Sequence, residues 1–420
     1  MPVWLIMVQD YNDILGDMRS MSMLRAVKTR LKRNNKMFVL LHPFHKAYRV
    51  GVMRLAQLRY GINPNKVIFS SFQGRSYNDN PRYISERLHA LRPDCEIVWL
   101  FREDVIDKVQ VPPYVKKQYR IRRPGLVEQA TARFWVDDFR HTESLHLDGR
   151  RQFYIQTWHG DRGFKRVGDD NEKLPYKVLR MEDKCAMMIA GSEFGANNYR
   201  TAFHMTGEIL MDGCPRNDLL LRNDPAQAAE IRGRLGIAPE TGILMYAPTY
   251  RDNRNRDRAR QDATLDIPRT LDFLESHTGR RWVCLCRTHY LSFGMNVSDD
   301  PRIIPASDWP EMAELLLVTD MLITDYSSCG ADFTLLRRPM FLYQADVDEY
   351  LNQSRHFYFP MEESPFLIAH SQEELEKLIL ETDAETAREN GEALDRFFHT
   401  TETGHAAEAV CRYIMDRMKD

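Results

Sequence analysis

The chain has 420 residues, of which 43% are hydrophobic and 28% charged, and its formal net charge is −2. This length exceeds one ordinary core and indicates about two to three domains, and the composition is typical of a soluble globular protein. The longest early apolar run, Val3 to Val8, is far shorter than the roughly 20 residues that span a bilayer, so we expect neither a membrane span nor a signal peptide there.

Residues 1–60 form a basic N-terminal segment. They contain eleven Lys or Arg residues against three acidic ones, and apolar residues recur at spacings of three and four from Ile14 to Leu31. This pattern predicts a basic amphipathic helix. Two interpretations stay open: the helix lies on an anionic membrane surface, where each cation contributes about 1 kcal/mol, or it is a solvated helix docked on its own domain.

Strand-like runs alternate with helix-compatible stretches between residues 61 and 225. This alternation predicts a domain with a parallel α/β sheet. Its strands are expected at Val67–Phe69, Ile97–Phe101, Phe134–Val136, Phe153–Gln156 and Met187–Ala190.

A second series of strands follows the charged stretch Leu221–Pro239, so the boundary between two α/β domains is expected near residues 218–240 and the second domain at 235–420. The final segment, Glu385–Asp420, is helical in pattern and is expected to pack back across the domains. The strands of the second domain are expected at Ile243–Ala247, Trp282–Cys286, Arg302–Ile304, Met321–Thr324 and Pro339–Tyr343.

The cysteines favour a reducing compartment. Seven is an odd number, and Cys284 and Cys286 alternate within an apolar segment, which fits buried reduced thiols better than disulfides or zinc ligands. We therefore expect a cytoplasmic protein. No acidic cluster stands out as a metal site, so neither a metal nor a cofactor is expected.

Short polar clusters follow the predicted strands. In an open parallel sheet, ligands bind in the crevice outside the carboxyl ends of the strands, so clusters at these positions belong to a site. Arg, His, Ser and Thr, which suit phosphate groups, dominate them. The clusters are Gln156–Gly160, Gly213–Asp218, Ala247–Asp252, Arg287–His289 and Thr324–Ser328.

His159 follows a predicted strand and precedes Gly160, a small neighbour that would admit a substrate. An imidazole can accept a proton from an attacking hydroxyl group. A lone histidine is more often structural, but the neighbouring Lys165 and Arg166 favour a site that binds phosphate.

Thr324–Ser328 precede a predicted helix, so exposed backbone amides, two serine hydroxyls and the helix dipole would form an anion site. Ordinary N-capping is the simpler alternative, although a cap needs fewer hydroxyls. Arg251, Arg287 and His289 follow two further strands, where they would hold a diphosphate and neutralise a leaving phosphate.

In their order along the chain, these clusters resemble the CDP-glycerol glycerophosphotransferase family, the teichoic acid primases and polymerases of bacterial envelopes. The similarity runs from about Val67 to Tyr358. It rests on Ser71–Arg82, Thr157–Gly160, Pro215–Asp218, Ala247–Asp252 and Ile323–Ser328.

The resemblance implies two Rossmann-like α/β domains in a glycosyltransferase-B (GT-B) arrangement, with the acceptor facing residues 61–225 and the nucleotide donor bound by residues 235–420. It also implies that His159 and His289 are catalytic, with His159 as the base that deprotonates the acceptor hydroxyl and His289 beside the diphosphate. The implied acceptor-binding residues are Trp158, Lys165 and Arg166. The implied donor-binding residues are Arg251, Arg287, Thr324, Ser327, Ser328 and Asp332.

The implied reaction is transfer of a polyol phosphate, glycerol phosphate in the simplest case, from a CDP-polyol to a hydroxyl of a lipid-linked or growing polymer acceptor. CMP is released, and the enzyme is expected at the inner face of the membrane. Asp161–Lys165 replaces the run Thr-Pro-Leu-Lys usual after Trp-His-Gly, and Tyr290 replaces a usual proline. These departures leave CDP-ribitol open as the donor.

Two further alternatives differ in class. A GT-B sugar transferase or epimerase would use a UDP- or GDP-sugar, and fold alone does not separate it from the first interpretation. A non-catalytic polymer-binding module would keep the pocket without turnover, against which the retained histidines and serines argue. No nucleic-acid partner is expected.

Overall fold

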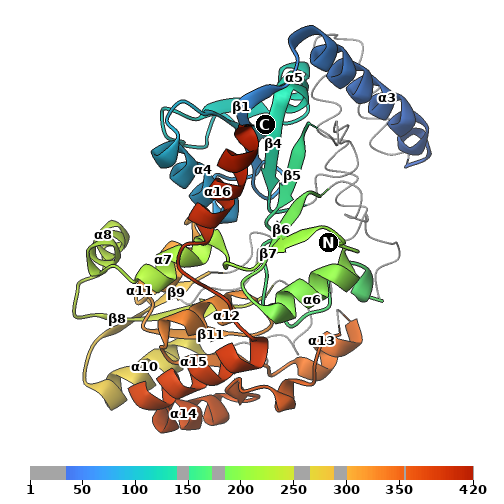
Figure 1. Ribbon diagram of the computed structural model, residues 1–420. Coiled ribbons are helices and arrows are strands. Elements are labelled where there is room, and N and C mark those ends of the chain that lie inside the picture. The colour runs from blue at the N-terminus through green and yellow to red at the C-terminus, as the bar shows by residue number, and fades with distance from the viewer. Residues whose placement is uncertain are drawn as a thin grey trace.

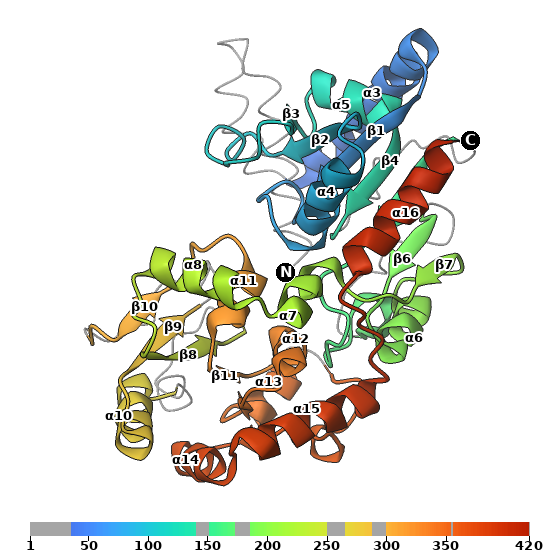
Figure 2. The ribbon, with the colours of Figure 1, turned by 60° about the vertical axis from the view of Figure 1, so that its left-hand side comes forward.

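The computed structural model describes residues 35–139, 151–172, 185–249, 265–287, 300–353 and 356–419. Two parallel sheets, one of seven strands and one of six, form two α/β units (Figures 1 and 2). This is the Rossmann-like, two-unit GT-B arrangement expected from the sequence. The predicted helix from Ile14 to Leu31, together with Arg251 and His289, lies outside the described residues.

The first unit is built on strands in the order β3-β2-β1-β4-β5-β6-β7. The chain order reverses between β1 and β4, so the carboxyl ends of these two strands form the crevice of the sheet. Helices α3 (Asn35–Tyr60), α5 (Arg123–Thr131) and α6 (Glu193–Ala202) pack on one face, and α4 (Asp79–Leu91) packs on the other. The strands are β1 (Asn63–Ser70), β2 (Glu96–Phe101), β3 (Lys116–Tyr119), β4 (Ala132–Asp137), β5 (Phe153–Gln156), β6 (Met187–Ile189) and β7 (Glu208–Leu210).

The second unit has strands in the order β10-β9-β8-β11-β12-β13, and its chain order reverses between β8 and β11. Helices α10 (Ile267–Thr278) and α14 (Gln372–Glu381) pack on one face. The other face carries α7 (Asp218–Arg222), α8 (Pro225–Leu235), α11 (Met312–Val318), α12 (Cys329–Phe333), α13 (Val347–Gln353) and α15 (Ala384–Phe398). The strands are β8 (Gly242–Ala247), β9 (Trp282–Cys286), β10 (Ile303–Pro305), β11 (Met321–Thr324), β12 (Met340–Tyr343) and β13 (Ile368–Ala369).

The ten strands expected from apolar runs are all present, because continuous apolar runs fit strands that are covered on both faces. Strand β8 is buried at every position, and both Cys284 and Cys286 in β9 are buried free thiols, as predicted. The sequence interpretation missed β3, β7 and β13. These three strands lie near or at the sheet edges and are partly exposed, so their residues do not form the apolar run by which a central strand is recognised.

The last helix, α16 (Ala406–Met418), follows the second unit in the chain but packs on the first. It lies beside α4 in both ribbon views (Figures 1 and 2), and Val410, Cys411 and Ile414 join the core that also contains Ile84 of α4. The chain therefore crosses between the units twice. Among the described helices, none has both the length and the apolar character needed to cross a membrane.

Candidate active site

His159 lies directly after β5, at the carboxyl edge of the first sheet. Its ring packs against those of Trp158, Phe72 and Phe139, with centroid separations of 4.3, 5.3 and 5.5 Å. Nδ1 of His159 is 2.8 Å from the backbone carbonyl oxygen of Asp138. A carbonyl oxygen only accepts, so Nδ1 donates its proton and the neutral ring carries its lone pair on Nε2.

Asp138 fixes the loops around His159 and was not among the predicted site residues. Its fully buried carboxyl group accepts hydrogen bonds from Ser71 Oγ at 2.5 Å and from the backbone N–H of Phe72 at 2.7 Å. Burial, reinforced by the negative charges of Asp79 and Asp137, raises the pKa of Asp138. Because Asp138 directly follows β4, beside the reversal point of the sheet, the strand-end rule could have found it.

Trp158 adopts a left-handed backbone conformation, with φ of 51°. Such a conformation is strained for a bulky residue and persists only where the surroundings hold it. The side-chain amide of Asn80, which is fully buried, donates to the carbonyl oxygen of Trp158 at 3.1 Å. The indole ring packs against Phe203 at 4.6 Å between ring centroids. The backbone before His159 is therefore held from α4.

The loop after His159 enters the second unit. A Cβ atom on Gly160 would lie 3.3 Å from Ser328 Oγ, and one on Gly163 would lie 3.6 Å from Ser328 Cβ. Phe164 is 1% exposed and joins the core of the second unit. The fold thus brings the predicted residue His159 close to the predicted turn Ser327–Ser328, although the two come from different sheets.

Ser327 and Ser328 lie between β11 and α12, and both are partly exposed. The backbone N–H of Cys329 donates to Ser327 Oγ at 3.4 Å. The helix that follows has only five residues, so the helix dipole expected to favour an anion here is weak. Thr324, also predicted to bind the donor, is fully buried and donates from Oγ1 to the carbonyl oxygen of Ala247 at 2.7 Å, joining β11 to β8.

Arg287 lies just after β9 and is partly buried. Its Nη1 donates to the carbonyl oxygens of Trp309 at 2.7 Å and Ala306 at 3.1 Å. Burial lowers the pKa of Arg287, and the nearby Glu311 opposes this effect. The guanidinium group is therefore anchored from one side at the carboxyl edge of the second sheet.

Lys165 and Arg166 connect the His159 loop to a segment of the second unit. Lys165 forms an antiparallel bridge with Phe357, and the Arg166 guanidinium donates to the carbonyl oxygen of Phe357 at 3.2 Å. Arg166 also forms an exposed ion pair with Glu172 at 3.2 Å. Acceptor binding by these two residues stays a prediction, since the contacts of Arg166 also serve the loop itself.

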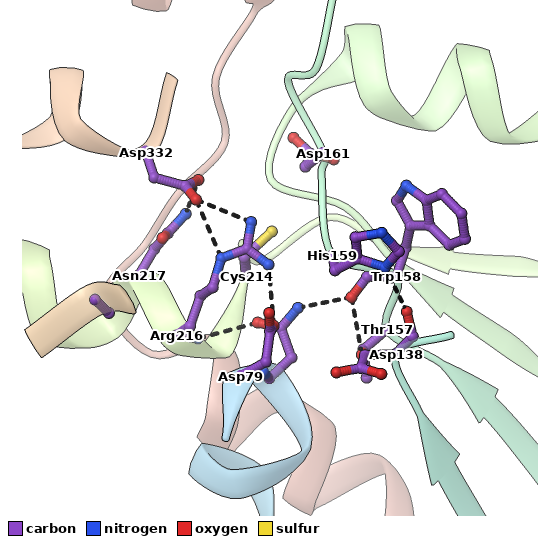
Figure 3. Close-up of polar contacts among 12 residues, drawn as sticks. Asp79, Asp138, Thr157, Trp158, His159, Asp161, Cys214, Arg216, Asn217 and Asp332 are labelled. Atoms are coloured by element: carbon purple, nitrogen blue, oxygen red, sulfur yellow. Dashed lines mark hydrogen bonds and ion pairs between the residues drawn. The ribbon is translucent and has the colours of Figure 1, made fainter. Parts of the chain in front are cut away.

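Asp332 of α12 is already engaged by residues of the first unit. Its carboxylate accepts from Arg216 at 2.9 and 3.1 Å and from Asn217 at 3.0 Å (Figure 3). The sequence analysis noted Pro215–Asp218 but assigned no role to Arg216. Donor binding by Asp332 stays a prediction. Within the described ranges, no cluster of three or more His, Cys, Asp or Glu residues could hold a metal ion.

Comparison with known proteins shows the family to which the chain belongs. The family model for CDP-glycerol:poly(glycerophosphate) glycerophosphotransferases matches residues 52–416. A teichoic acid poly(glycerol phosphate) polymerase of Staphylococcus epidermidis is 32% identical over 76% of the chain, which spans only 46% of that relative. A teichoic acid glycerol-phosphate transferase of Staphylococcus aureus is 30% identical, with 84% of this chain and 93% of the relative covered.

A solved structure and a more distant relative extend the comparison. A variant of the wall teichoic acid polymerase TagF soaked with CDPG has a TM-score of 0.76 and 28% identity, over 96% of this chain and 98% of that one. A ribitol-phosphate polymerase of Staphylococcus aureus matches at 27% identity over 74% of the chain. The sequence identity of the chain to these glycerol-phosphate relatives is thus higher than its identity to the ribitol-phosphate polymerase.

Proposed function

The chain belongs to the CDP-glycerol:poly(glycerophosphate) glycerophosphotransferase family, and from this premise we propose that it transfers glycerol phosphate from CDP-glycerol to a hydroxyl of a teichoic acid or capsule-type polymer, releasing CMP. The observation that carries the proposal is the approach of the two units at the site. Gly160, next to His159, lies against Ser328, next to Ser327. This approach supports a site in which a base from the first unit faces a pair of hydroxyl groups suited to phosphate from the second.

In this proposal His159 is the general base. Nε2 accepts the proton of the acceptor hydroxyl, and the acceptor oxygen attacks the phosphorus that bears the glycerol. The bond from that phosphorus to the bridging oxygen breaks, and CMP leaves with the electron pair. The hydrogen bond from Nδ1 to the Asp138 carbonyl oxygen supports this role, because it selects the tautomer and stabilises the positive charge that develops on the ring.

The proposed diphosphate site combines Arg287, Ser327 and Ser328 with Arg251 and His289. A guanidinium group and hydroxyl donors would neutralise the charge that grows on the leaving phosphate. The anchoring of Arg287 to the Ala306 and Trp309 carbonyl oxygens supports a fixed cation at this edge of the sheet. Trp158, Lys165 and Arg166 are proposed on the acceptor side.

The test is release of CMP from purified protein supplied with CDP-glycerol or CDP-ribitol, with and without a glycerol-phosphate-primed or lipid-linked disaccharide acceptor. We expect acceptor-dependent CMP from CDP-glycerol and a lower rate with CDP-ribitol. A higher rate with CDP-ribitol would change the assigned donor. A sugar transferase would be supported instead if neither donor releases CMP and if UDP or GDP competes for the nucleotide site as strongly as CDP does.

We further propose that the acceptor is lipid-linked and that the enzyme works on the anionic inner face of the membrane. Helix α3 supports this, because Leu55, Leu58 and Tyr60 are 69%, 85% and 64% exposed and Arg54 and Arg59 are exposed beside them. Apolar side chains flanked by cations suit the interface of an anionic bilayer.

This membrane proposal predicts that the protein cosediments with phosphatidylglycerol vesicles and much less with phosphatidylcholine vesicles. A variant with Leu55→Ser and Leu58→Ser should bind anionic vesicles about tenfold more weakly, since two exposed apolar side chains are lost. Replacement of Leu380, which is 55% exposed on α14, by Ser is the matched control and should change nothing. If the Leu55→Ser, Leu58→Ser variant and the Leu380→Ser variant bind anionic vesicles equally, the proposed role of α3 is contradicted.

A further inference from the structure

Asp332 joins the two units at the base of the proposed phosphate turn. It stands four residues after Ser328, in α12, and its side chain is only 9% exposed. Oδ2 accepts from Nε and Nη2 of Arg216, and Oδ1 accepts from Asn217 at 3.0 Å. Both donors belong to η3 (Pro215–Asn217), which follows the first sheet. The carboxylate thus accepts three hydrogen bonds from a segment that follows the opposite sheet.

Arg162 provides a second cation on the same carboxylate. This arginine stands three residues after His159, is 1% exposed, and its Nη2 lies 3.4 Å from Asp332 Oδ1. Glu402, in the segment between α15 and α16, lies 3.3 Å from the same Nη2 and accepts from Asn217 at 2.6 Å. Buried charges require partners, and here the charged groups of Arg162, Arg216, Asp332 and Glu402 come from four segments of the chain.

Arg216 is also linked, through Asn80, to the backbone that leads to His159. Its own N–H donates to Asn80 Oδ1 at 3.1 Å, and Asn80 Nδ2 donates to the Trp158 carbonyl oxygen at 3.1 Å. Nη1 of Arg216 donates to Asp79 at 3.0 Å. Figure 3 shows Arg216 between Asp332 on one side and Asp79 on the other, with Trp158 and His159 beyond. Two hydrogen bonds of the Asn80 side chain thus connect Arg216 to Trp158, the residue before His159.

We propose that Asp332 is a positioning residue that does not touch the donor: held by Arg216 and Arg162, it fixes the Ser327–Ser328 turn against the His159 loop. The proposal rests on the proposed transferase function and deepens it. Its physical basis is that an in-line displacement needs the base and the phosphate site in register, and a misplacement of about 1 Å can cost about 100-fold in rate. The two units supply one half of the reaction each, so this ion cluster sets their separation.

The test is Asp332→Asn, an isosteric change that removes the charge. We expect kcat for acceptor-dependent CMP release to fall about 100-fold, while KM for CDP-glycerol and Kd for CDP stay within about threefold of wild type. The matched control is Glu314→Gln. Glu314 is an equally buried carboxylate, 8% exposed, that pairs with Arg82 across the same interface at 3.0 Å but does not touch the Ser327–Ser328 turn. This control should keep kcat within about threefold.

Two results with Asp332→Asn would overturn the proposal. A rise of about tenfold or more in Kd for CDP would mean that Asp332 binds the donor, and an unchanged kcat would mean that the cluster does not position the turn. If Asp332→Asn does not fold, Arg216→Lys serves instead, because it keeps the charge but loses the two-pronged contact. For this variant too, we expect kcat to fall and Kd for CDP to stay nearly unchanged. Absence of CMP release by wild-type protein would refute the transferase function itself, independently of these variants.

Discussion

At the scale of single residues, the site depends on how backbone groups orient side chains. The Asp138 carbonyl oxygen selects the tautomer of His159, and the buried Asp138 carboxyl group holds Phe72 against the imidazole ring. Trp158 keeps its left-handed backbone because Asn80 binds its carbonyl oxygen. His159, the proposed base, is thus held by the loops after β1 and β4 and by α4.

His159→Ala should lower kcat by about 10²- to 10⁴-fold, the usual contribution of a general base. Kd for CDP, measured by calorimetry, should stay within about threefold, because the base acts on the acceptor. His277→Ala, on the exposed side of α10, is the control and should leave kcat unchanged. Weakening of CDP binding by His159→Ala about tenfold would show that His159 also contacts the donor.

At the scale of elements, the loop that follows β5 of the first sheet places Phe164 in the core of the second unit. Phe164 lies among the rings of Phe357, Phe366 and Phe359, at centroid distances of 5.6, 5.7 and 6.4 Å. Because this aromatic contact anchors the loop that follows His159, the position of the proposed base depends on the core of the opposite unit. Gly160 permits the close approach to Ser328 that accompanies it.

Phe164→Ala should therefore affect both stability and turnover. Removing a buried phenyl ring costs about 3–5 kcal/mol of unfolding free energy, and the freed loop should lower kcat as well. Phe341→Ala, at a fully buried position in β12, should cost a similar amount of stability but leave kcat of the folded enzyme nearly unchanged. Urea unfolding and CMP release on both variants make the comparison. Equal kcat values for the two would contradict anchoring through Phe164.

At the scale of the whole molecule, buried polar groups join the two units. Besides the Asp332 cluster, Glu311 accepts from the backbone N–H of Asp79 at 2.9 Å, and α16 crosses back to pack on α4. Buried ion pairs often add little net stability because of their desolvation cost, but losing one partner is expensive. Such contacts therefore select one relative arrangement of the units, and they add little to the free energy of unfolding.

This interface predicts a stability that falls as pH rises from about 5 to about 8. Burial raises the pKa of Glu311 to about 7, with Asp79 adding to the shift, and burial also raises the pKa of Glu402 to about 7, against the opposing charge of Arg162. Both values lie above the ordinary 4.5, so the folded state binds more protons than the unfolded state between these values. The stability that these two groups contribute is fully present at a pH below their pKa in the unfolded state. It is lost as the pH rises through their pKa in the folded state.

The loss is at most about 3 kcal/mol for each group, at 1.36 kcal/mol per pKa unit. Urea unfolding at pH 5 and pH 8 measures it. The variant with Glu311→Gln and Glu402→Gln should show a clearly smaller change over this range than wild type. An identical pH dependence in the two proteins would contradict the assignment to these carboxyl groups.

The sequence by itself determined ten of the thirteen described strands, the polar clusters at their ends and the family. Apolar runs such as Ile243–Ala247 mark central strands because both of their faces are buried, and clusters such as Thr324–Ser328 follow from the rule that sites lie at strand ends. These signals are local, so they can be read without the fold. Edge strands such as Lys116–Tyr119 carry no such signal because they are partly exposed.

Only the tertiary structure decided which residues meet. Nothing in the local pattern pairs Arg216 with Asp332, places Asp138 over His159 or sends α16 back to α4, because these contacts join segments far apart in the chain. Asp332 and Thr324 carried the same prediction as Ser327 and Ser328, yet their polar groups are engaged inside the protein. Periodicity and motifs indicate which residues are present at a strand end. The contacts within and between the two units determine which of these residues are engaged inside the protein.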